Sequence, residues 1–492
     1  MASTDGEVQQ PLVSAENIRM LLEFLPKVPH LVRVALLHVL GLSKQSQYRG
    51  LQTELIIATI RAFLNPSRPK SVTETQRIIG KDPGIKGRIW VSKYAAPAPP
   101  ETSVRDALVK AIDALRHEGT PGHELQLPET VPVEAEWTAY RAGVATDARL
   151  PPISEKEKYD EMMKECKNPT TILYFHGGAY WLMDPATHRP STKRLAKLTG
   201  GRCYSVRYRL APQNPFPAAL LDALVSYLTL LYPPPGAFHE AVKPEHIVIS
   251  GDSAGGNLSL ALLQLLLELR RQDIRIRWFG EERDIPLPAG VATSSPWVDL
   301  THSSPSWETN GEFDYLPVPK ALDIAKLPPC PAWPATPPRK ALYVADALLT
   351  HPLVTLSTAR SWKGAPPVYM CTGWEMLADE DKYMAAKLHR DGVPVVFEEY
   401  EAMPHCFALL LEKLPGSRRC LEGWTGFIMQ AVQDPSGIKS SFRTVKAKTL
   451  EEVELDPKEL CPFTEEEVRE RVFQRAKEDV AAEDAVDAIA KL

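Results

Sequence analysis

A regular alternation of short apolar runs with longer amphipathic stretches, beginning near residue 169, is the feature that most restricts the fold of this 492-residue chain. The runs are rich in β-branched and aromatic residues and predict strands at 170–175, 202–206, 246–250, 290–294, 367–371 and 395–400. Helical spacing of apolar residues occupies the intervals at about 217–232, 255–271, 378–391 and 418–433. Because the strands are almost uniformly apolar, we expect an α/β fold with a mostly parallel central sheet and helices on both faces.

Proline is the residue type whose share is unusual, with 45 Pro against 27 Gly. This load excludes a chain that is helical throughout, and it predicts long irregular connections. The prolines concentrate in residues 97–152 and 301–340. Because strand patterns resume after the second segment, we interpret that segment as an excursion from one domain.

The same patterns predict how the chain is organised. Residues 1–165 form a helical and Pro-rich N-terminal extension, with helices at Leu31–Leu40 and Leu51–Leu64. Residues 166–300 and 361–434 form the α/β core, and residues 301–360 are a Pro-rich insertion. Residues 435–492 form a charged, largely helical tail. Both Pro-rich segments are expected to form a cap outside the sheet.

Charge and cysteine content exclude several classes of protein. The net charge of −5 leaves no basic surplus for nucleic acid. The seven cysteines are odd in number and include no CxxC pair, which argues against a disulfide framework or a zinc site. We therefore expect reduced thiols, no metal and no cofactor. The sequence gives no indication of oligomeric state.

The N-terminal region bears on location. The first residues are polar and acidic and lack the features of a signal peptide, which predicts an intracellular protein. The most apolar early stretch, Leu31–Leu42, is too short to span a bilayer. A cap or core helix is the favoured interpretation, and contact with a membrane surface through the N-terminal helices is the alternative.

The strongest local motif is Gly251-Asp-Ser-Ala-Gly255, which stands between a predicted strand and a long predicted helix. Small residues at 251, 254 and 255 permit the sharp turn that exposes a nucleophilic hydroxyl, here Ser253. The Ala254 amide lies at the helix N-terminus and is suited to stabilise negative charge. Asp252 is expected to make a structural hydrogen bond.

A serine nucleophile needs a base and an acid that orients it. His405 follows the predicted strand that ends at Tyr400, and Glu375 follows the one that ends at Cys371. The order of Ser253, Glu375 and His405 is the order expected when each lies in a loop after a strand. Asp379, one helical turn beyond Glu375, remains an alternative acid.

Acyl transfer also needs amide donors for the developing oxyanion. The segment His176-Gly-Gly-Ala-Tyr180 follows the predicted strand 170–175 directly. Its glycines leave backbone N–H groups accessible. We predict donors at Gly177, Gly178 and Ala254.

The motifs together resemble the hormone-sensitive-lipase group of α/β-hydrolases. The matching segments are His176-Gly-Gly-Ala, Tyr208-Arg-Leu-Ala-Pro-Gln-Asn-Pro-Phe-Pro-Ala-Ala219, Gly251-Asp-Ser-Ala-Gly-Gly-Asn257, Ser295-Pro-Trp-Val-Asp-Leu300 and Met403-Pro-His405. The resemblance implies an α/β-hydrolase fold, a Ser253–Glu375–His405 triad, and a cap built from the N-terminal residues and the insertion. Two positions depart from the group's pattern: Ala179 replaces a third glycine, and Glu375 replaces an aspartate. The long N-terminal region is similar to that of large fungal members, among them steryl acetyl hydrolase-like proteins.

These observations predict a hydrolase of small-molecule carboxylic esters with short or medium acyl groups. Acetyl esters of sterol-like or secondary-metabolite alcohols are the more specific expectation. Tyr180, Trp181 and Trp297 are candidate pocket residues, with core packing as the alternative for each. An amidase or formamidase, an acyl-CoA thioesterase and a non-catalytic receptor remain alternatives. The last three residues, Ala490-Lys-Leu492, are close to the peroxisomal Ser-Lys-Leu address, so location is predicted as cytoplasmic or peroxisomal.

Overall fold

The computed structural model describes residues 24–65, 69–117, 125–318 and 324–490, with side chains of the last helix described up to residue 478. The chain divides into two compact units, Met1–Ser67 and Arg68–Leu492. In the first unit, α2 (Val28–Val39) and α3 (Leu51–Leu64) pack against each other. Both helices were predicted from the sequence, and both are confirmed.

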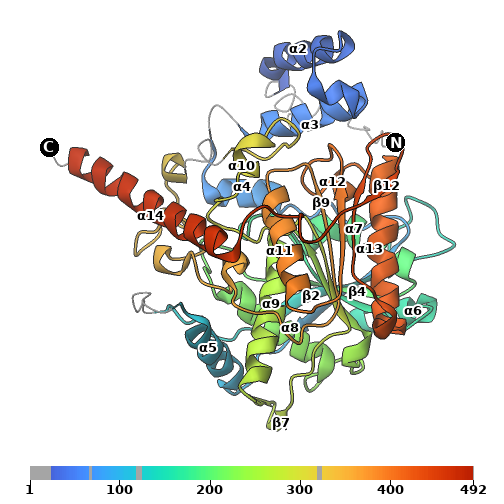
Figure 1. Ribbon diagram of the computed structural model, residues 1–492. Helices are drawn as coiled ribbons and strands as arrows, with labels where there is room; N and C mark the ends of the chain where they lie inside the picture. Colours follow the sequence, from blue (N-terminus) through green and yellow to red (C-terminus); the bar gives the residue numbers. More distant parts are fainter. Residues whose placement is uncertain (1–23, 66–68, 118–124, 319–323, 491–492) are drawn as a thin grey trace, which may run out of the picture. The chain divides into compact units, whose positions relative to one another are not determined.

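The second unit is built on a central sheet whose described residues form ten strands in the order β1-β2-β4-β3-β5-β8-β9-β10-β11-β12 (Figure 1). The run from β4 to β11 is parallel, and β1, β2 and β12 pair antiparallel at the two ends. The bounds are β1 Ile89–Ala96, β2 Val133–Tyr140, β3 Thr171–Phe175, β4 Arg202–Arg207, β5 Ile247–Asp252, β8 Gly290–Ser294, β9 Val368–Gly373, β10 Val395–Tyr400, β11 Ser441–Val445 and β12 Glu452–Glu454. A separate hairpin pairs β6 (Ile276–Trp278) with β7 (Glu281–Arg283).

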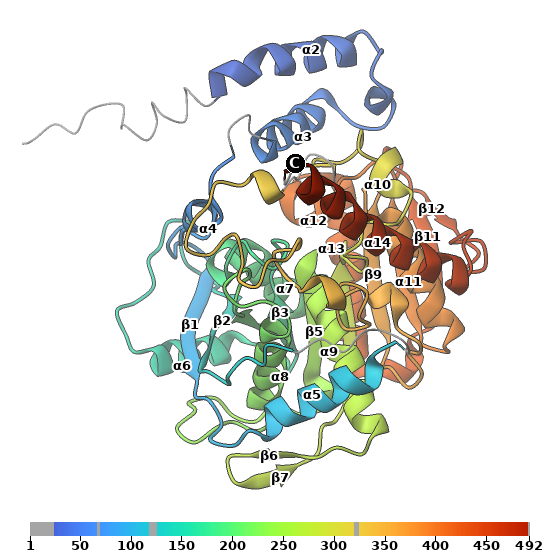
Figure 2. The ribbon, with the colours of Figure 1, turned by 90° about the vertical axis from the view of Figure 1, so that its left-hand side faces the viewer.

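All six predicted strands are present, as β3, β4, β5, β8, β9 and β10. Their side chains are almost all buried, because helices cover the sheet on both sides. Figure 1 shows α8, α9 and α11 on one side and α7 and α13 on the other. Figure 2 looks onto the side covered by α5, α8 and α9. The predicted α/β class is confirmed.

The helices of the second unit span the intervals that the apolar spacing predicted, with shorter ones added in the loops. Their bounds are α4 Val72–Ile79, α5 Ser103–Leu115, α6 Glu155–Glu165, α7 Arg189–Thr199, α8 Ala218–Leu231, α9 Ala254–Arg271, α10 Ser306–Thr309, α11 Ala378–Arg390, α12 Phe407–Leu410, α13 Pro415–Gln433 and α14 Glu465–Ala490. No helix within the described ranges is both long enough and apolar enough to cross a bilayer.

Two predicted boundaries need correction. The extension 1–165 was expected to lie outside the sheet, but it contributes β1 and β2. The tail 435–492 was expected to be helical, but it adds β11 and β12 before α14 begins. These strands mix polar with apolar residues, so they lack the uniform apolar pattern that marked the core strands. Tertiary pairing, not local pattern, makes them strands.

A buried ion pair ties β2 to the core. Glu136 of β2 is fully buried, and both of its carboxylate oxygens accept from the Arg189 guanidinium, from Nε at 2.7 Å and Nη2 at 2.6 Å. Arg189 also donates to Asp82, which precedes β1. A bidentate Arg–carboxylate contact fixes orientation as well as distance. This contact joins the start of α7 to the N-terminal strands.

The Pro-rich insertion 301–360 is mostly irregular in its described part, as predicted. An apolar cluster joins it to α4: Val72, Trp333 and Leu342 are buried together, and Trp181 packs against them. Gln76 of α4 donates its Nε2 to the carbonyl oxygens of Trp181 and Ala211, each at 2.9 Å. The insertion and α4 therefore lie against the loop that follows β3.

Candidate active site

The predicted site residues lie in loops at the carboxyl ends of adjacent parallel strands. The loop after β3 carries His176, the turn after β5 carries Ser253, the loop after β8 begins with Ser295, the loop after β9 carries Glu375, and the loop after β10 carries His405. Parallel strands present their carboxyl ends at one edge, where open α/β sheets bind ligands. The sheet therefore brings these loops together.

Ser253 lies on a strained turn between β5 and α9. Its backbone has φ +53° and ψ −122°, a conformation that costs a non-glycine residue about 1–3 kcal/mol. Three backbone hydrogen bonds hold it: its N–H donates to Ser294 O at 3.0 Å, and its carbonyl accepts from Asn257 N at 3.0 Å and Trp297 N at 3.1 Å. Unlike its neighbours at 252 and 254, Ser253 is partly exposed. This is the geometry of a nucleophile elbow.

Glycines make the turn possible. A Cβ at Gly255 would lie 2.0 Å from the carbonyl oxygen of Phe175, and a Cβ at Gly251 would lie 2.4 Å from that of Gly255. Both obstacles are backbone atoms, which cannot move aside cheaply. The spacing of small residues in the motif therefore has a steric cause.

Glu375 and His405 form a buried pair. Glu375 Oε1 lies 2.7 Å from His405 Nδ1, and the two residues are 0% and 3% exposed. The other carboxylate oxygen, Oε2, accepts from Ser295 Oγ at 2.7 Å and from Gly373 N at 3.1 Å. Because an ionised carboxylate only accepts, Nδ1 carries the hydrogen, and this leaves the Nε2 lone pair for a proton.

The surroundings of His405 favour its protonated form. Burial by itself would lower the pKa of the imidazole, but the charge and hydrogen bond of Glu375, together with other nearby carboxylates, raise the pKa above its usual value. The charges of Asp314 and Asp252 act in the same direction. The same carboxylates that raise the pKa of His405 stabilise the imidazolium that forms when His405 accepts a proton.

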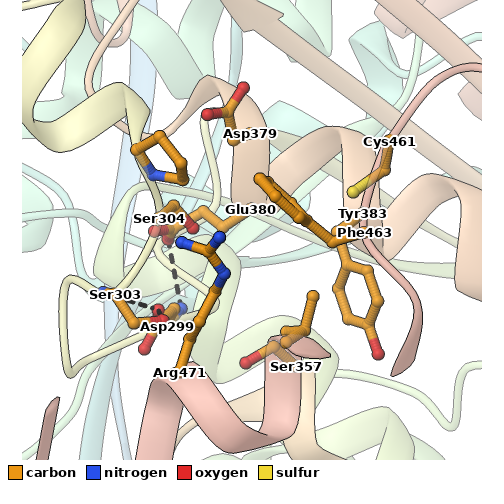
Figure 3. A pocket seen from close by; sticks show the side chains of 12 residues that line it. Asp299, Ser303, Ser304, Ser357, Asp379, Glu380, Tyr383, Cys461, Phe463 and Arg471 are labelled. Carbon is orange, nitrogen blue, oxygen red and sulfur yellow. Dashed lines mark hydrogen bonds between the residues drawn. The ribbon is translucent and has the colours of Figure 1, made fainter. Parts of the chain in front are cut away.

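The alternative acid, Asp379, lies elsewhere. Its Oδ2 accepts from the backbone N–H of Ser306 at 2.9 Å. Figure 3 shows Asp379 among the residues around a cavity of about 10 Å³, which is lined also by residues of α14 and has room for one water molecule. The structure thus brings Glu375, and not Asp379, to His405.

Ser253 and His405 occupy neighbouring positions without a hydrogen bond between their side chains in the described residues. Their sequence neighbours meet, since Cys406 Sγ lies 3.9 Å from Asp252 Oδ2. The end of β8 and the residue after it provide a second link, because Ser294 O accepts from Ser253 N at 3.0 Å and the Ser295 hydroxyl accepts from Cys406 N at 3.1 Å. Catalytic hydrogen bonds often shorten only when substrate binds.

The oxyanion loop after β3 corrects one predicted donor. The N–H of Gly177 donates to Asp252 Oδ1 at 3.2 Å, and the Tyr174 hydroxyl donates to the same oxygen at 2.6 Å. Asp252 thus makes the structural bond expected of it, but it engages the Gly177 amide. Among the described residues, the N–H groups of Gly178, Ala179 and Ala254 have no acceptor.

Backbone conformation explains why those amides are accessible. Gly178 has φ +109°, and Ala179 has φ +51°. A Cβ at Gly178 would lie 2.4 Å from the Leu182 carbonyl oxygen, so only glycine fits there. Successive residues of positive φ turn their N–H groups away from regular pairing. The donors that this geometry leaves are Gly178, Ala179 and Ala254.

His176 fixes the start of this loop. Its Nδ1 lies 2.7 Å from the Gly177 carbonyl oxygen, and its ring stacks on Tyr208 with centroids 4.4 Å apart. Burial lowers the pKa of His176 to about 4, so the imidazole is neutral and Nδ1–H donates to that carbonyl. His176 is therefore a support of the loop and not a base.

Comparison with known proteins shows which family the chain belongs to. A family model described as alpha/beta hydrolase fold matches residues 172–409. An acetyl-hydrolase from Streptomyces hygroscopicus is 31% identical to the chain over 264 residues, which are 53% of this chain and 76% of that protein. The chain belongs to the α/β-hydrolase fold family. An esterase from Acinetobacter venetianus is 29% identical over 53% of this chain and 75% of that protein.

Solved structures agree on the fold of this hydrolase. An esterase from the bacterial hormone-sensitive lipase family superposes with a TM-score of 0.52 at 22% identity, covering 78% of this chain and 99% of that one. An esterase/lipase from an uncultured bacterium gives 0.50 at 22% identity, covering 76% and 98%. The resemblance drawn from the motifs is confirmed. The chain is a carboxylic ester hydrolase.

The three aromatic residues predicted for the pocket of the hydrolase have different environments. Tyr180 is fully buried, its ring stacks on Tyr343 at 3.6 Å, and its hydroxyl donates to Asn257 Oδ1. Tyr180 therefore packs in the core, which was the alternative interpretation for this residue. Trp181 and Trp297 are partly exposed, at the edge of the insertion cluster and beside the Ser253 turn respectively. Both remain candidates.

Two residues of the site were not predicted as functional from the sequence. Ser295 binds the second oxygen of Glu375, and its position directly after a core strand was a usable signal. Asp314 lies in the irregular insertion and accepts from the backbone N–H groups of Met376 and His405. No local pattern marks Asp314. In the described part of the hydrolase, no group of three or more His, Cys, Asp or Glu side chains is arranged to hold a metal ion.

Proposed function

We propose that this hydrolase cleaves carboxylic esters through an acyl-enzyme, with Ser253 as nucleophile, His405 as general base and acid, and Glu375 as the group that orients His405. The observation that carries the proposal is the buried 2.7 Å contact between Glu375 Oε1 and His405 Nδ1. That contact lies beside a serine held in a strained, partly exposed turn.

The chemistry follows from these positions. As Ser253 Oγ attacks the ester carbonyl carbon, His405 Nε2 takes its proton, and the imidazolium is stabilised by Glu375. Negative charge on the carbonyl oxygen is stabilised by the N–H groups of Gly178, Ala179 and Ala254. The bond to the alcohol oxygen then breaks, and His405 returns the proton to that oxygen. Water repeats the sequence on the acyl-enzyme and releases the acid.

We propose acetyl or other short acyl esters of sterol-like or secondary-metabolite alcohols as the substrate class. Two facts support this choice. The relative that is named an acetyl-hydrolase matches this chain over 76% of its own length, and an apolar cluster of the insertion packs beside the oxyanion loop. In that cluster the partly exposed Trp181 would contact the alcohol. Amides and acyl-CoA thioesters are the alternatives, because the same triad can cleave them.

A substrate panel tests this choice. Hydrolysis of p-nitrophenyl esters from acetyl to dodecanoyl, of the matching anilide and of an acyl-CoA should give the highest kcat/KM with acetyl or butyryl ester. Ser253→Ala serves as the blank for each substrate. Faster turnover of the anilide would make the protein an amidase, and faster turnover of the acyl-CoA would make it a thioesterase.

The peroxisomal address is tested separately. The last two residues of the tripeptide Ala490-Lys-Leu492 lie outside the described residues. Deletion of the tripeptide from a fluorescent fusion tests whether it directs the protein to peroxisomes.

The first unit supports a second proposal, contact with an anionic membrane surface. Val28, Val32, Leu36 and Val39 follow one face of α2 and are 37–72% exposed. Residues 24–65 hold five cationic side chains, at positions 27, 33, 44, 49 and 61, of which Arg49 is buried, and one acidic side chain, Glu54. The whole chain carries −5, so this stretch differs in sign from the chain as a whole. An exposed apolar face with cationic flanks is typical of helices that bind anionic lipid surfaces.

Vesicle binding tests the second proposal. The protein should sediment with phosphatidylserine-containing vesicles and less with phosphatidylcholine vesicles. The double variant Val32→Asp/Leu36→Asp should lose this binding and keep its turnover of a soluble acetyl ester. Equal sedimentation of wild type and variant would contradict the proposal, and self-association of the wild type lost in the variant would assign the face to a second copy of the chain.

A further inference from the structure

Asp314 is a buried carboxylate that reaches the catalytic loops from the insertion. It is 0% exposed. Its Oδ2 accepts from Met376 N at 2.9 Å, next to Glu375, and its Oδ1 accepts from His405 N at 3.2 Å. Oδ1 also accepts from Tyr315 N at 2.7 Å. One side chain of the insertion thus contacts the loops that hold both the acid and the base.

These contacts differ from an ordinary loop turn. A bond from an aspartate to the amide of the next residue stabilises only its own loop. The bonds to residues 376 and 405 cross 62 and 91 positions of sequence, respectively, and join three separate segments. Those two amides belong to loops without regular secondary structure, so they have no ladder or helix bond to hold them. Without Asp314, two N–H groups would be left buried, at about 1–3 kcal/mol each.

We propose that Asp314 is a positioning residue of the catalytic site: it holds the loops so that Glu375 Oε1 and His405 Nδ1 stay 2.7 Å apart, and it places a second carboxylate beside the imidazole. The inference rests on the triad function proposed above and adds to it. It makes the insertion, expected from the sequence to form a cap, a support for the acid–base pair. Rearrangement of the insertion would then change the rate of the chemical step as well as the binding of substrate.

The charges around His405 indicate what the loss of Asp314 would do. His405 faces Glu375 from the loop after β9, Asp252 from the end of β5 and Asp314 from the insertion, with Tyr315 and Cys406 beside it. Burial lowers the pKa of His405, and the three carboxylates raise it, Glu375 most and Asp314 next. For Asp314, burial raises the pKa of the carboxyl, while the positive charge of His405 acts to lower it. Removing the Asp314 charge should therefore lower the pKa of His405.

The test compares Asp314→Asn with Asp299→Asn. Asp299 is a matched control, because it is also buried, lies just before the insertion, and accepts from the local amides of Thr301 and Ser303. Both variants are checked for folding by circular dichroism, and kcat and KM on p-nitrophenyl acetate are measured from pH 5 to 9. Asp314→Ser is a second uncharged variant for the case in which Asp314→Asn does not fold.

We expect Asp314→Asn to lower kcat on the order of 100-fold with little change in KM, since small displacements of catalytic groups cost about this much. The acid limb of its kcat/KM profile should move to lower pH. Asp299→Asn should change the melting temperature but neither kcat nor the pH at which kcat/KM falls. Equal kinetics in the two variants, or failure of both Asp314 variants to fold while Asp299→Asn folds, would overturn the inference. An inactive wild type would instead refute the proposed function.

Discussion

Replacing Glu375 by Gln removes one charge and keeps the shape of the side chain. In the native site Oε1 accepts from His405 Nδ1 at 2.7 Å, while Oε2 accepts from Ser295 Oγ and Gly373 N. The amide of Gln has only one oxygen. If its NH₂ faces His405, Nδ1 must accept, Nε2 carries the hydrogen, and the base is in the wrong tautomer. If the NH₂ of Gln instead faces Gly373, it meets the Gly373 N–H, and two donors cannot form a hydrogen bond with each other.

The size of the effect follows from the burial of this pair. At an effective dielectric of about 20, opposite charges about 4 Å apart attract by about 4 kcal/mol. An imidazolium that forms in the transition state loses that attraction in the variant, which is about a thousandfold in rate. The tautomer penalty adds to this loss. We therefore expect kcat to fall by about 10³–10⁴-fold, the range known for removal of the acid charge from such triads.

The assay is p-nitrophenyl acetate hydrolysis at saturating substrate, with Asp379→Asn as the matched control. Asp379 lies in the same segment but accepts from Ser306 N, so its variant should stay within a few-fold of wild type. Circular dichroism checks that both variants fold. A larger loss for Asp379→Asn, or less than a tenfold loss for Glu375→Gln, would refute the assignment of the acid.

Three further outcomes follow. Gly178→Ala should lower kcat on the order of 100-fold or more, because a Cβ would meet backbone 2.4 Å away in the oxyanion loop; Gly143→Ala, with open space around it, is the control, and equal activity would contradict this account. Because His405 must be neutral to act as base and its pKa is raised, kcat/KM should fall with decreasing pH from a midpoint above 6.5; a plateau down to pH 5 would contradict this. Arg189→Ala should destabilise the fold by about 3 kcal/mol in urea unfolding, since Glu136 stays buried and keeps only the longer 3.8 Å contact with Arg207; a change below about 1 kcal/mol would refute this.

The core strands could be predicted because burial on both faces makes them uniformly apolar. The strand Ile89–Ala96 could not, since Ser92 and Lys93 interrupt its apolar pattern and prolines follow it closely. Its pairing with β2 decides its conformation. The same reason explains why the extension was assigned wholly to the cap.

The site shows a similar division. Ser253, Glu375 and His405 could be predicted because each follows a recognisable strand. The choice between Glu375 and Asp379 could not be settled, because both stand near the start of one helix and the path of the loop decides which side chain meets His405. Asp314 carries no local signal at all, since only the folded chain brings residue 314 to residues 376 and 405. The Gly177 amide was assigned wrongly because its partner, Asp252, lies 75 residues away.

Covalent labelling of Ser253 tests the central claim most directly. The wild-type protein is treated with a fluorophosphonate, and the adduct is located by intact-mass measurement and peptide mapping. The account predicts one adduct per chain on the peptide that contains Ser253, and none in Ser253→Ala. Absence of labelling in the folded wild type, or an adduct that persists in Ser253→Ala, would contradict it.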